Sequence, residues 1–396
     1  YRWNWFYLLI IGAAASLVFY WRIQIFGDLE PRSDQAFLAW WVKGLVNSNH
    51  IFPHIDQGER LIDALARDET GFLTQLLRPI YNSPTELFKI IPILAYYGTA
   101  QFFGDSYSNQ VAMSIFTSAV IPFILALFPI YHKSFGVHLS RFAIGLIALF
   151  IASTSVYLHF FSGWGIHNSG ILTLVIAVIV SSGILSKLGK NNARWIPWRY
   201  VIGLFLINGL ALYSFKTNLL LLPPATVFAL FALPGVKWQQ KFTLVFCYTL
   251  IVTVLILPIV PLTLISTNKP EFAQDMTSPI ALMLADLPTN PLNWLIIIYE
   301  RSLSWFTTAH KLYSLPGLTL GIIGLVILAR DGIKLPFYLM LAHYLSWCFI
   351  PIFAGVAFRT YPYLIPFLIL GGAYFLVISC HRTVLRGVNK KIFFSI

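Results

Sequence analysis

The sequence predicts an all-α, polytopic transmembrane protein. Of its 396 residues, 58% are hydrophobic and only 11% are charged, whereas an ordinary soluble domain carries about 25% charged residues. The mean hydropathy is +0.74, and the apolar residues occur in runs that are too long for one globular core. These observations exclude a soluble enzyme, a nucleic-acid-binding protein and a disordered chain.

Ten apolar segments are candidates for transmembrane helices, each of which needs about 20 mostly apolar residues. They are 4–27, 109–130, 141–160, 169–187, 200–214, 217–234, 242–266, 316–330, 335–354 and 360–380. An eleventh segment, 88–103, is shorter, opens with Lys89 and contains Pro92 and Gly98. We expect it to form a short re-entrant or half-buried helix. The expected organisation is one transmembrane domain, 1–396, with 10 or 11 membrane helices.

Basic residues predict how these spans are oriented. The chain has 27 Lys and Arg against 15 Asp and Glu, which gives a net charge of +12. If the N-terminus is cytoplasmic and 88–103 does not cross, every strongly basic connection lies on one side, as the positive-inside rule requires. These connections are 132–133, 187–199, 236–241, 330–334 and the tail 381–391. We therefore expect cytoplasmic termini and two long outer loops, 28–88 and 268–315.

Each outer loop contains an aromatic-rich amphipathic stretch, and helices of this kind settle at the bilayer interface. In the first loop, Lys43 lies opposite an apolar face made by Phe37, Leu38, Trp40, Trp41, Leu45 and Val46. In the second loop, a similar face is expected from Trp294, Leu295, Ile298, Leu303, Trp305 and Phe306.

The acidic residues are distributed unevenly. Ten of the fifteen lie between positions 28 and 105, and none lies between 106 and 270. Since an ion-coupled transporter keeps carboxylates within its spans, their absence from six consecutive spans argues against that class. Asp28, Glu30 and Asp34 instead follow the first span. A partly desolvated carboxylate there can act as a general base toward a hydroxyl; the alternative is that these residues solvate a loop and that Asp34 caps a helix.

Several weak motifs follow one another in an order that resembles a known family. They are Arg32-Ser33-Asp34-Gln35-Ala36, Ser83-Pro84, the helix that opens with Lys89, Phe103-Gly104-Asp105-Ser106, the stretch from Gly209 through Lys216 to Pro223, and the stretch from Phe358-Arg359 to Pro366. By order and spacing they cover most of the chain. The chain resembles the GT-C integral-membrane glycosyltransferases, in the branch of the protein O-mannosyltransferases and the lipid A aminoarabinose transferases.

The resemblance implies a GT-C-like fold and the transfer of a sugar from a polyprenyl-phosphate-linked donor to an acceptor hydroxyl. The transfer would be inverting and would take place on the outer (periplasmic or luminal) face. The catalytic acid of the family maps onto Asp34. The usual Asp-Glu pair is Asp34-Gln35 here, and the usual Pro-containing entry is replaced by Ser83-Pro84. Asp28 and Glu30 therefore stay alternatives for the base.

Cations and polar residues on the predicted outer face are candidates for substrate binding. A phosphate leaving group needs positive charge, so we expect Lys216 and Arg359, with Lys89, to bind the donor phosphate. The alternative for such residues is anchoring at the lipid headgroups. His167 and Asn168 are candidates for contacts with sugar or acceptor hydroxyls, and Trp164 is a candidate for stacking on a sugar ring or for interfacial anchoring.

No metal site is predicted. His50 and His54, with acidic residues nearby, superficially suit zinc, but Pro53 interrupts the helix that would place both on one face. The sequence shows no required cofactor, and a divalent cation stays compatible with it. The expected partners are a lipid-linked sugar donor, membrane lipids and an acceptor that is a lipid, a glycan or a protein, and not nucleic acid. The expected location is a bacterial plasma membrane.

Three other functions fit the same residues. One is a flippase or transporter of lipid-linked sugars that performs no chemistry. A second is a polymerase or ligase that acts on lipid-linked oligosaccharide. A third is a non-catalytic membrane subunit, for which the charged residues of the outer face would be incidental. A product with a new glycosidic bond would separate the enzymes from the flippase.

Overall fold

The computed structural model describes residues 2–26, 34–46, 72–82, 84–136, 138–155, 158, 165–190, 198–259, 261–262, 291–350 and 360–393. Within these residues every regular element is a helix, which confirms the all-α prediction. The α-helices are α1 (Arg2–Phe26), α2 (Asp34–Val46), α4 (Phe72–Asn82), α5 (Ile90–Phe103), α6 (Tyr107–Tyr131), α7 (His138–Thr154), α9 (Gly165–Lys190), α10 (Trp198–Leu212), α11 (Thr217–Phe231), α12 (Trp238–Ile256), α15 (Pro291–Tyr313), α16 (Leu315–Arg330), α17 (Leu335–Phe349) and α20 (Ile365–Phe393). The 3-10 helices are η2 (Pro84–Lys89), η3 (Lys133–Phe135) and η5 (Tyr361–Tyr363).

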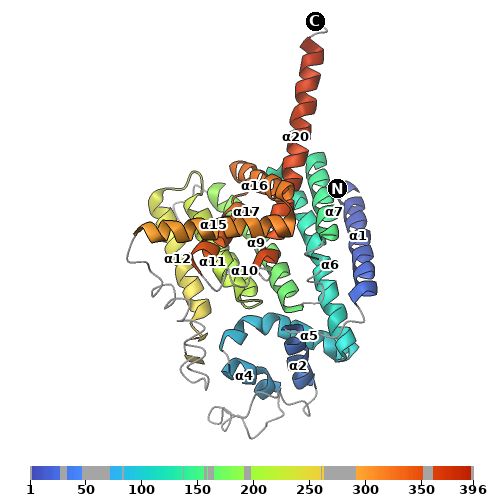
Figure 1. The fold of residues 1–396 in the computed structure, drawn as a ribbon, viewed down its shortest axis with the longest axis vertical. Coiled ribbons are helices and arrows are strands. Elements are labelled where there is room, and N and C mark those ends of the chain that lie inside the picture. The colour runs from blue at the N-terminus through green and yellow to red at the C-terminus, as the bar shows by residue number, and fades with distance from the viewer. Residues whose placement is uncertain are drawn as a thin grey trace.

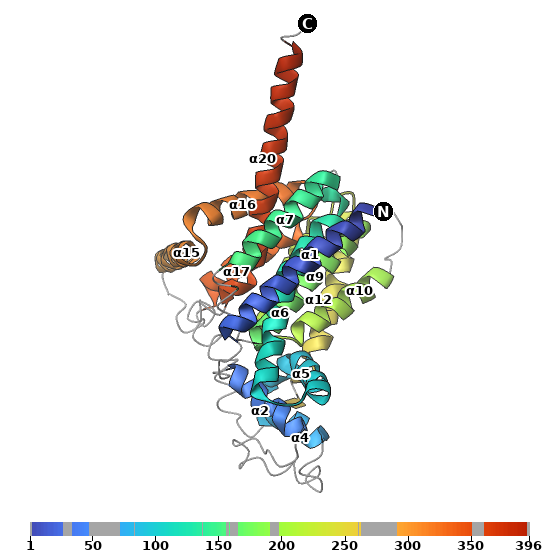
Figure 2. The ribbon, with the colours of Figure 1, turned by 90° about the vertical axis from the view of Figure 1, so that its right-hand side faces the viewer.

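The helices form a bundle with two distinct ends (Figures 1 and 2). The start of α1 and the end of α20 lie at one end, which we call the terminal end. Helices α2, α4 and α5 lie at the opposite end, which we call the capped end. A side-chain contact agrees with this arrangement. The hydroxyl of Tyr7, near the start of α1, donates a hydrogen bond to the carbonyl of Ala126, near the end of α6.

Each of the ten predicted spans overlaps a helix among the described residues, but the helices differ in length. By length and composition, α1, α6, α9 and α12 are able to cross a membrane, and α15 and α16 together would make a fifth span that bends by 109°. Helices α10 and α11 have 15 residues each, so they are about 22 Å long, which is less than the ~30 Å hydrocarbon core of a bilayer. The structure thus confirms several apolar helices that suit a membrane, and ten full spans stay a prediction.

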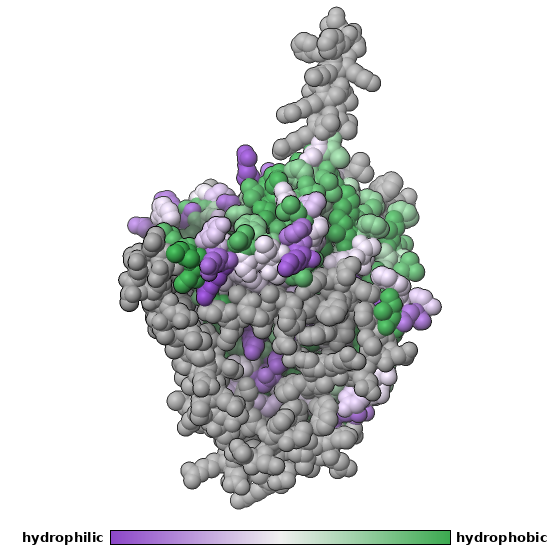
Figure 3. Space-filling model, in the orientation of Figure 1, coloured by the Kyte–Doolittle hydropathy of each residue, from purple (hydrophilic) through white to green (hydrophobic). Residues whose placement is uncertain are grey.

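The surface of the outlying helices is apolar, as the membrane prediction requires. Trp5, Leu9 and Leu17 of α1 are each about 70% exposed. Hydrophobic residues also cover much of the described surface near the point where α20 leaves the bundle (Figure 3). In water such a surface would be unfavourable, whereas lipid tails solvate it.

The segment 88–103 forms the end of η2 and all of α5. Helix α5 lies across the capped end next to α2 and does not run along the bundle (Figure 1). Helix α2 packs its apolar side against the neighbouring helices, because Leu38, Trp41 and Leu45 are buried in the main hydrophobic core. The aromatic-rich face predicted in the first outer loop is therefore largely occupied by neighbouring helices.

The second outer loop contains the long helix α15. The prediction that Trp305 lies on the exposed apolar face of this helix is wrong. Leu295, Leu303 and Phe306 are exposed, whereas Trp305 is buried. The indole N–H of Trp305 donates to Nδ1 of His343 at 3.0 Å, and Nη1 of Arg301 donates to the carbonyl of Cys348 at 2.6 Å. These bonds hold one side of α15 on α17 and leave the other apolar side at the surface.

Helices α16 and α20 pack closely together where their glycines face each other. A Cβ atom at Gly324 would collide with the carbonyl of Gly371, and one at Gly371 would collide with the carbonyl of Gly321. Small residues let two backbones approach closely, which is a typical way to join helices in membranes. The first part of α20, which follows η5, is almost completely buried as a result.

Two lysines bind carbonyl groups at the C-terminal end of α11, one on its last residue and one on the residue that caps it. Nζ of Lys241 donates to the carbonyl of Phe231 at 2.8 Å, and Nζ of Lys334 donates to the carbonyl of Ala232. Positive charge at a helix C-terminus interacts favourably with the helix dipole. Burial and the nearby Lys241 nevertheless lower the pKa of the Lys334 ammonium from its ordinary value.

Candidate functional site

The first part of the candidate site is η2, which carries Lys89. Nζ of Lys89 forms an ion pair with Glu86 at 2.8 Å, and the two side chains are only 12% and 14% exposed. The N–H of Ile91 donates to the carbonyl of Tyr213 at 3.1 Å, and the rings of Phe88 and Tyr213 lie 6.1 Å apart. The segment with Lys89 is thus fixed beside the break between α10 and α11.

Lys216 lies in that break, directly before α11. Its side chain is exposed, and it forms no ion pair in the part of the chain that the structure describes. The break itself is held firmly, because the buried Asn218 amide donates to the carbonyls of Gly170 at 3.1 Å and Ala211 at 2.8 Å. Lys89 and Lys216, which are far apart in sequence, therefore belong to neighbouring segments at the capped end.

His167 and Asn168 begin α9, close to the same break. Both side chains are 1% exposed. The ring centroids of His167 and Phe215 lie 4.6 Å apart, and Nδ1 of His167 lies 3.4 Å from the hydroxyl of Tyr363. These contacts bring the starts of α9 and α11 together with η5. Contact of His167 or Asn168 with a sugar stays a prediction, and it requires the side chains to become accessible.

Gly170 allows this close approach of three elements. A Cβ atom at Gly170 would lie 2.7 Å from both the Cβ atom of Phe215 and the hydroxyl oxygen of Tyr363. Real Cβ atoms do not approach other atoms so closely, so a larger residue would push η5 or the break away from α9.

Asp34 is the first residue of α2, at the capped end. This agrees with the expectation that a helix begins at this point. Lys43, further along α2, lies 4.0 Å from the centre of the Tyr107 ring, an arrangement typical of a cation–π contact. Asp28, Glu30, Trp164 and Arg359 lie outside the described residues, as do His50 and His54.

Sequence reasoning missed a polar stripe on α6, which consists of Gln110, Ser114 and Ser118. Residues four apart share one helix face. The Gln110 amide donates to the carbonyl of Ala39 in α2 at 3.4 Å, and the Asn168 amide donates to Ser114 Oγ at 3.2 Å. The stripe therefore connects α6 with α2 and α9. The sequence signal that could have identified the stripe was the four-residue spacing of these three polar residues at and within the predicted span 109–130.

Arg22 is the second residue that sequence reasoning missed. It lies near the end of α1 with 0% exposure, and its Nη1 donates to Ser118 Oγ of the polar stripe at 2.8 Å. Its Nε and Nη2 atoms are buried and have no hydrogen-bond partner among the described residues. An ionisable residue within an apolar span destabilises the span and is commonly functional. The presence of an arginine in the predicted span 4–27 was therefore the sequence signal that could have identified Arg22.

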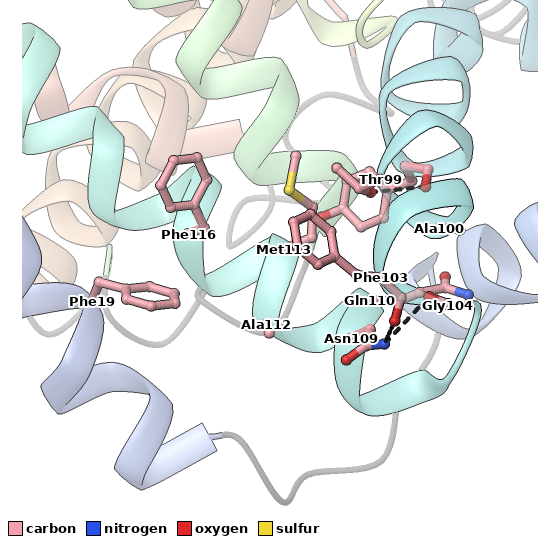
Figure 4. A pocket seen from close by; sticks show the side chains of 11 residues that line it. Phe19, Thr99, Ala100, Phe103, Gly104, Asn109, Gln110, Ala112, Met113 and Phe116 are labelled. Atoms are coloured by element: carbon pink, nitrogen blue, oxygen red, sulfur yellow. Dashed lines mark hydrogen bonds between the residues drawn. The ribbon is translucent and has the colours of Figure 1, made fainter.

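A cavity of about 470 Å³ lies between α1, α5 and α6 at the capped end. Phe19 and Phe116 lie toward one end of it, and Asn109 and Gln110 lie toward the other (Figure 4). No group of three or more His, Cys, Asp or Glu residues that could hold a metal ion is found in the described ranges.

Comparisons with protein-family models, curated proteins and solved structures find no match for this chain. The fold and the composition define its class as an all-helical protein with several helices that are able to span a membrane.

Proposed function

We propose that this protein is a GT-C-type membrane glycosyltransferase that moves a sugar from a polyprenyl-phosphate donor to an acceptor hydroxyl. The observation that supports this proposal is the meeting of separate motifs at the capped end. The hydrogen bond between Ile91 and Tyr213 joins the segment of Lys89 to the segment of Lys216, and α2 begins with Asp34 at the same end.

In this proposal Asp34 is the general base, with Asp28 and Glu30 as alternatives. The carboxylate takes the proton of the acceptor hydroxyl, and the oxygen then attacks the anomeric carbon of the donor sugar from the face opposite the phosphate. A carbon–oxygen bond forms, and the bond from the anomeric carbon to the phosphate oxygen breaks. The electron pair of that bond leaves with the lipid phosphate, and the anomeric configuration inverts.

Lys216 stabilises the charge that develops on the leaving phosphate. Its exposed ammonium group is accessible to a ligand, whereas Lys89 is already paired with Glu86 and would need to exchange partners. Arg359 is proposed to act with Lys216. His167, Asn168 and Trp164 are proposed to contact the sugar or the acceptor.

The proposed location is a bacterial plasma membrane, with the terminal end in the cytoplasm and the capped end outside. Exposed basic residues at the terminal end support this orientation. Lys187 in the last turn of α9, Lys237 directly before α12 and Arg330 at the end of α16 are exposed, and basic residues hold loops on the cytoplasmic side.

The test is a transfer assay in membranes that contain the protein and radiolabelled polyprenyl-phosphate sugars. We expect Asp34→Asn to lower the transfer rate by about 10²- to 10⁴-fold, as the loss of a general base does, while the donor still binds. Glu300→Gln is a matched control, because Glu300 is an exposed carboxylate on α15.

Each outcome of this assay distinguishes between functions. Loss of transfer in Asp34→Asn, with normal transfer in the Glu300→Gln control, supports the proposal. Unchanged transfer in Asp34→Asn, Asp28→Asn and Glu30→Gln contradicts the mechanism. Movement of labelled lipid across the bilayer without a new glycosidic bond would identify a flippase instead.

A further inference from the structure

Four connections between helices meet around a second cavity, which has a volume of about 210 Å³. Its wall is made by η3, the last turns of α9, the turn that follows α11 and the turn that joins α16 to α17. Each of these segments contains or borders one of the basic connections predicted to be cytoplasmic, which are 132–133, 187–199, 236–241 and 330–334. Ser186 in this wall lies ~28 Å along α9 from His167, at about 1.5 Å per residue. The cavity is therefore separate from the candidate site at the capped end.

Three serine side chains line this cavity with hydroxyl groups that have no partner in the part of the chain that the structure describes. They are Ser134, Ser182 and Ser186. Ser182 is only 5% exposed, and its Oγ atom is buried. By contrast, the hydroxyl of Thr226 in α11 donates to the carbonyl of Leu222 at 2.8 Å. A buried hydroxyl group without a partner destabilises a fold, so a ligand that bonds to Ser182 would recover this loss.

One cation and one carboxylate line the same cavity. Lys334 and Asp331 lie three residues apart in the turn between α16 and α17, and they form no ion pair with each other. Nζ of Lys334 donates to the carbonyl of Ala232, which leaves two of its three N–H groups for a ligand. Oδ2 of Asp331 accepts from the hydroxyl of Tyr374, which leaves Oδ1. Because Asp331 and Gly332 are exposed and line the cavity, the cavity opens to the surface at this turn.

The surroundings of Lys334 carry a second positive charge. Lys241 binds the neighbouring carbonyl of α11, that of Phe231. Burial and the nearby charge of Lys241 lower the pKa of the Lys334 ammonium, and neither lysine has an ion-pair partner among the described residues. A phosphate group beside Lys334 would compensate this charge and accept its free N–H groups.

We infer that this cavity binds a phosphoethanolamine group, as the headgroup of a membrane lipid or as a free molecule. The phosphate would accept hydrogen bonds from Lys334, the primary ammonium would donate to Asp331, and the serine hydroxyls would bond to either end. A volume of about 210 Å³ is that of about seven water molecules at ~30 Å³ each, which suits a group of this size. A quaternary choline group has no N–H donor, so the site should reject it.

The experiment uses native mass spectrometry of the full chain in detergent to measure the affinity of added ligands. The lipid probes are phosphatidylethanolamine, phosphatidylcholine and phosphatidylglycerol with identical acyl chains, and O-phosphoethanolamine is added as a soluble competitor. We expect the wild type to bind phosphatidylethanolamine about 10-fold more tightly than the other two lipids, because a hydrogen bond to a charged group is worth at least that much.

Asp331→Asn tests the contact with the ammonium group. The asparagine keeps an oxygen that can accept from Tyr374 and loses the charge. Binding of phosphatidylethanolamine should fall about 10-fold, to the level of phosphatidylcholine, whose own binding should not change. Glu300→Gln, which replaces an exposed carboxylate on α15, should bind like the wild type. Unchanged selectivity in Asp331→Asn would overturn the inference.

Lys334→Gln tests the contact with the phosphate. All three lipids contain this group, so each should bind about 10-fold more weakly. Lys241→Gln is the matched control, because Lys241 makes the same kind of bond to the end of α11 and does not line the cavity. This variant should lose less affinity. Equal losses would show that both lysines act only through α11, and they would overturn the inference.

Ser182→Ala and Ser181→Ala separate contact with the ligand from an effect on α9. Both hydroxyls are buried and have no partner in the described ranges, but only Ser182 lines the cavity. Ser182→Ala should weaken binding of phosphatidylethanolamine by about 3- to 10-fold, as the loss of one hydrogen bond does, and Ser181→Ala should bind like the wild type. The two variants should melt at similar temperatures without ligand. Equal affinities of the two variants would contradict the inference.

The wild type alone also gives decisive results. Equal binding of all three lipids, or preference for phosphatidylglycerol, would overturn the inference. Competition by O-phosphoethanolamine would identify the free group as a ligand, and selective lipid binding without such competition would identify the lipid headgroup; both results support the assignment of the cavity. Since sugar transfer is not measured, the outcome does not depend on the proposed function.

Discussion

Lys216 and Lys89 differ in how available their charges are to a ligand. Lys89 is half of an ion pair with Glu86, whereas Lys216 is exposed and has no ion-pair partner among the described residues. An ammonium group that is already paired must give up its partner before it can bind phosphate. The proposed function therefore depends on Lys216 more than on Lys89.

We expect Lys216→Gln to raise the KM for a polyprenyl-phosphate sugar by about 10-fold and also to lower kcat, since the phosphate gains charge as the glycosidic bond breaks. Steady-state transfer kinetics at several donor concentrations measure both constants. Lys311→Gln, which replaces an exposed lysine at the end of α15, is the control. Unchanged kinetics in Lys216→Gln would assign this lysine to headgroup anchoring.

Single residues were only partly predictable from the sequence. Lys89, Lys216, His167 and Asn168 were identified as individual candidates, and the structure places their segments at one end of the bundle. Sequence spacing does not show that Lys89 is paired or that His167 is buried, because both depend on contacts between distant segments. Arg22 was overlooked because it lies near the end of an apolar run, where an arginine usually reaches the headgroups.

At the scale of elements, the glycine contact between α16 and α20 makes a sharp prediction. We expect Gly324→Ala to lower the free energy of unfolding by about 1–3 kcal/mol, because the new methyl group would meet the backbone of Gly371, which cannot move aside without shifting a helix. Thermal unfolding in detergent measures this change.

Gly183→Ala is the matched control for this substitution. Gly183 also lies within a helix, α9, and a Cβ atom there would have open space around it. Alanine is the better helix former by roughly 0.5–1 kcal/mol, so this variant should be as stable as the wild type or more stable. Equal stability of the two variants would contradict the close packing of α16 on α20.

The apolar runs predicted the positions of the helices more accurately than they predicted the residues at which the helices end. The run 217–234 forms α11, which already ends at Phe231, because Pro234 and Gly235 make the turn to α12 and Gly235 has a φ of 71°. Proline disfavours a helical conformation in the residue before it, and a positive φ favours glycine. The 109° bend between α15 and α16 was not predictable, because it depends on the packing of α15 against α17 and on Ser314, whose φ is 70°.

At the scale of the molecule, the start of α1 and the end of α20 lie at the same end of the bundle (Figures 1 and 2). A chain with this arrangement passes between the two ends an even number of times. Ten full spans agree with this, and eleven do not. The position of α5 across the capped end agrees with the same count, since α5 makes no pass of its own.

Cysteine labelling tests the proposed orientation. In a background in which Cys247, Cys348 and Cys380 are replaced by serine, we expect Lys216→Cys to react with a membrane-impermeant maleimide in intact cells. Lys187→Cys should react only after permeabilisation, because Lys187 is exposed and lies in the last turn of α9, on the side proposed to be cytoplasmic. Labelling of both variants in intact cells, or of Lys187→Cys alone, would contradict the orientation.

Helix α20 also has a practical consequence for work on this protein. It begins buried in the bundle, continues without a break to Phe393 and projects beyond the terminal end (Figures 1 and 2). A continuous helix fixes the orientation of whatever follows it in helical register, because its rise and rotation per residue are constant. A soluble domain grafted in helical register after Phe393 would therefore be held at a defined angle to the bundle, and it would serve as a rigid marker for particle alignment in electron cryomicroscopy.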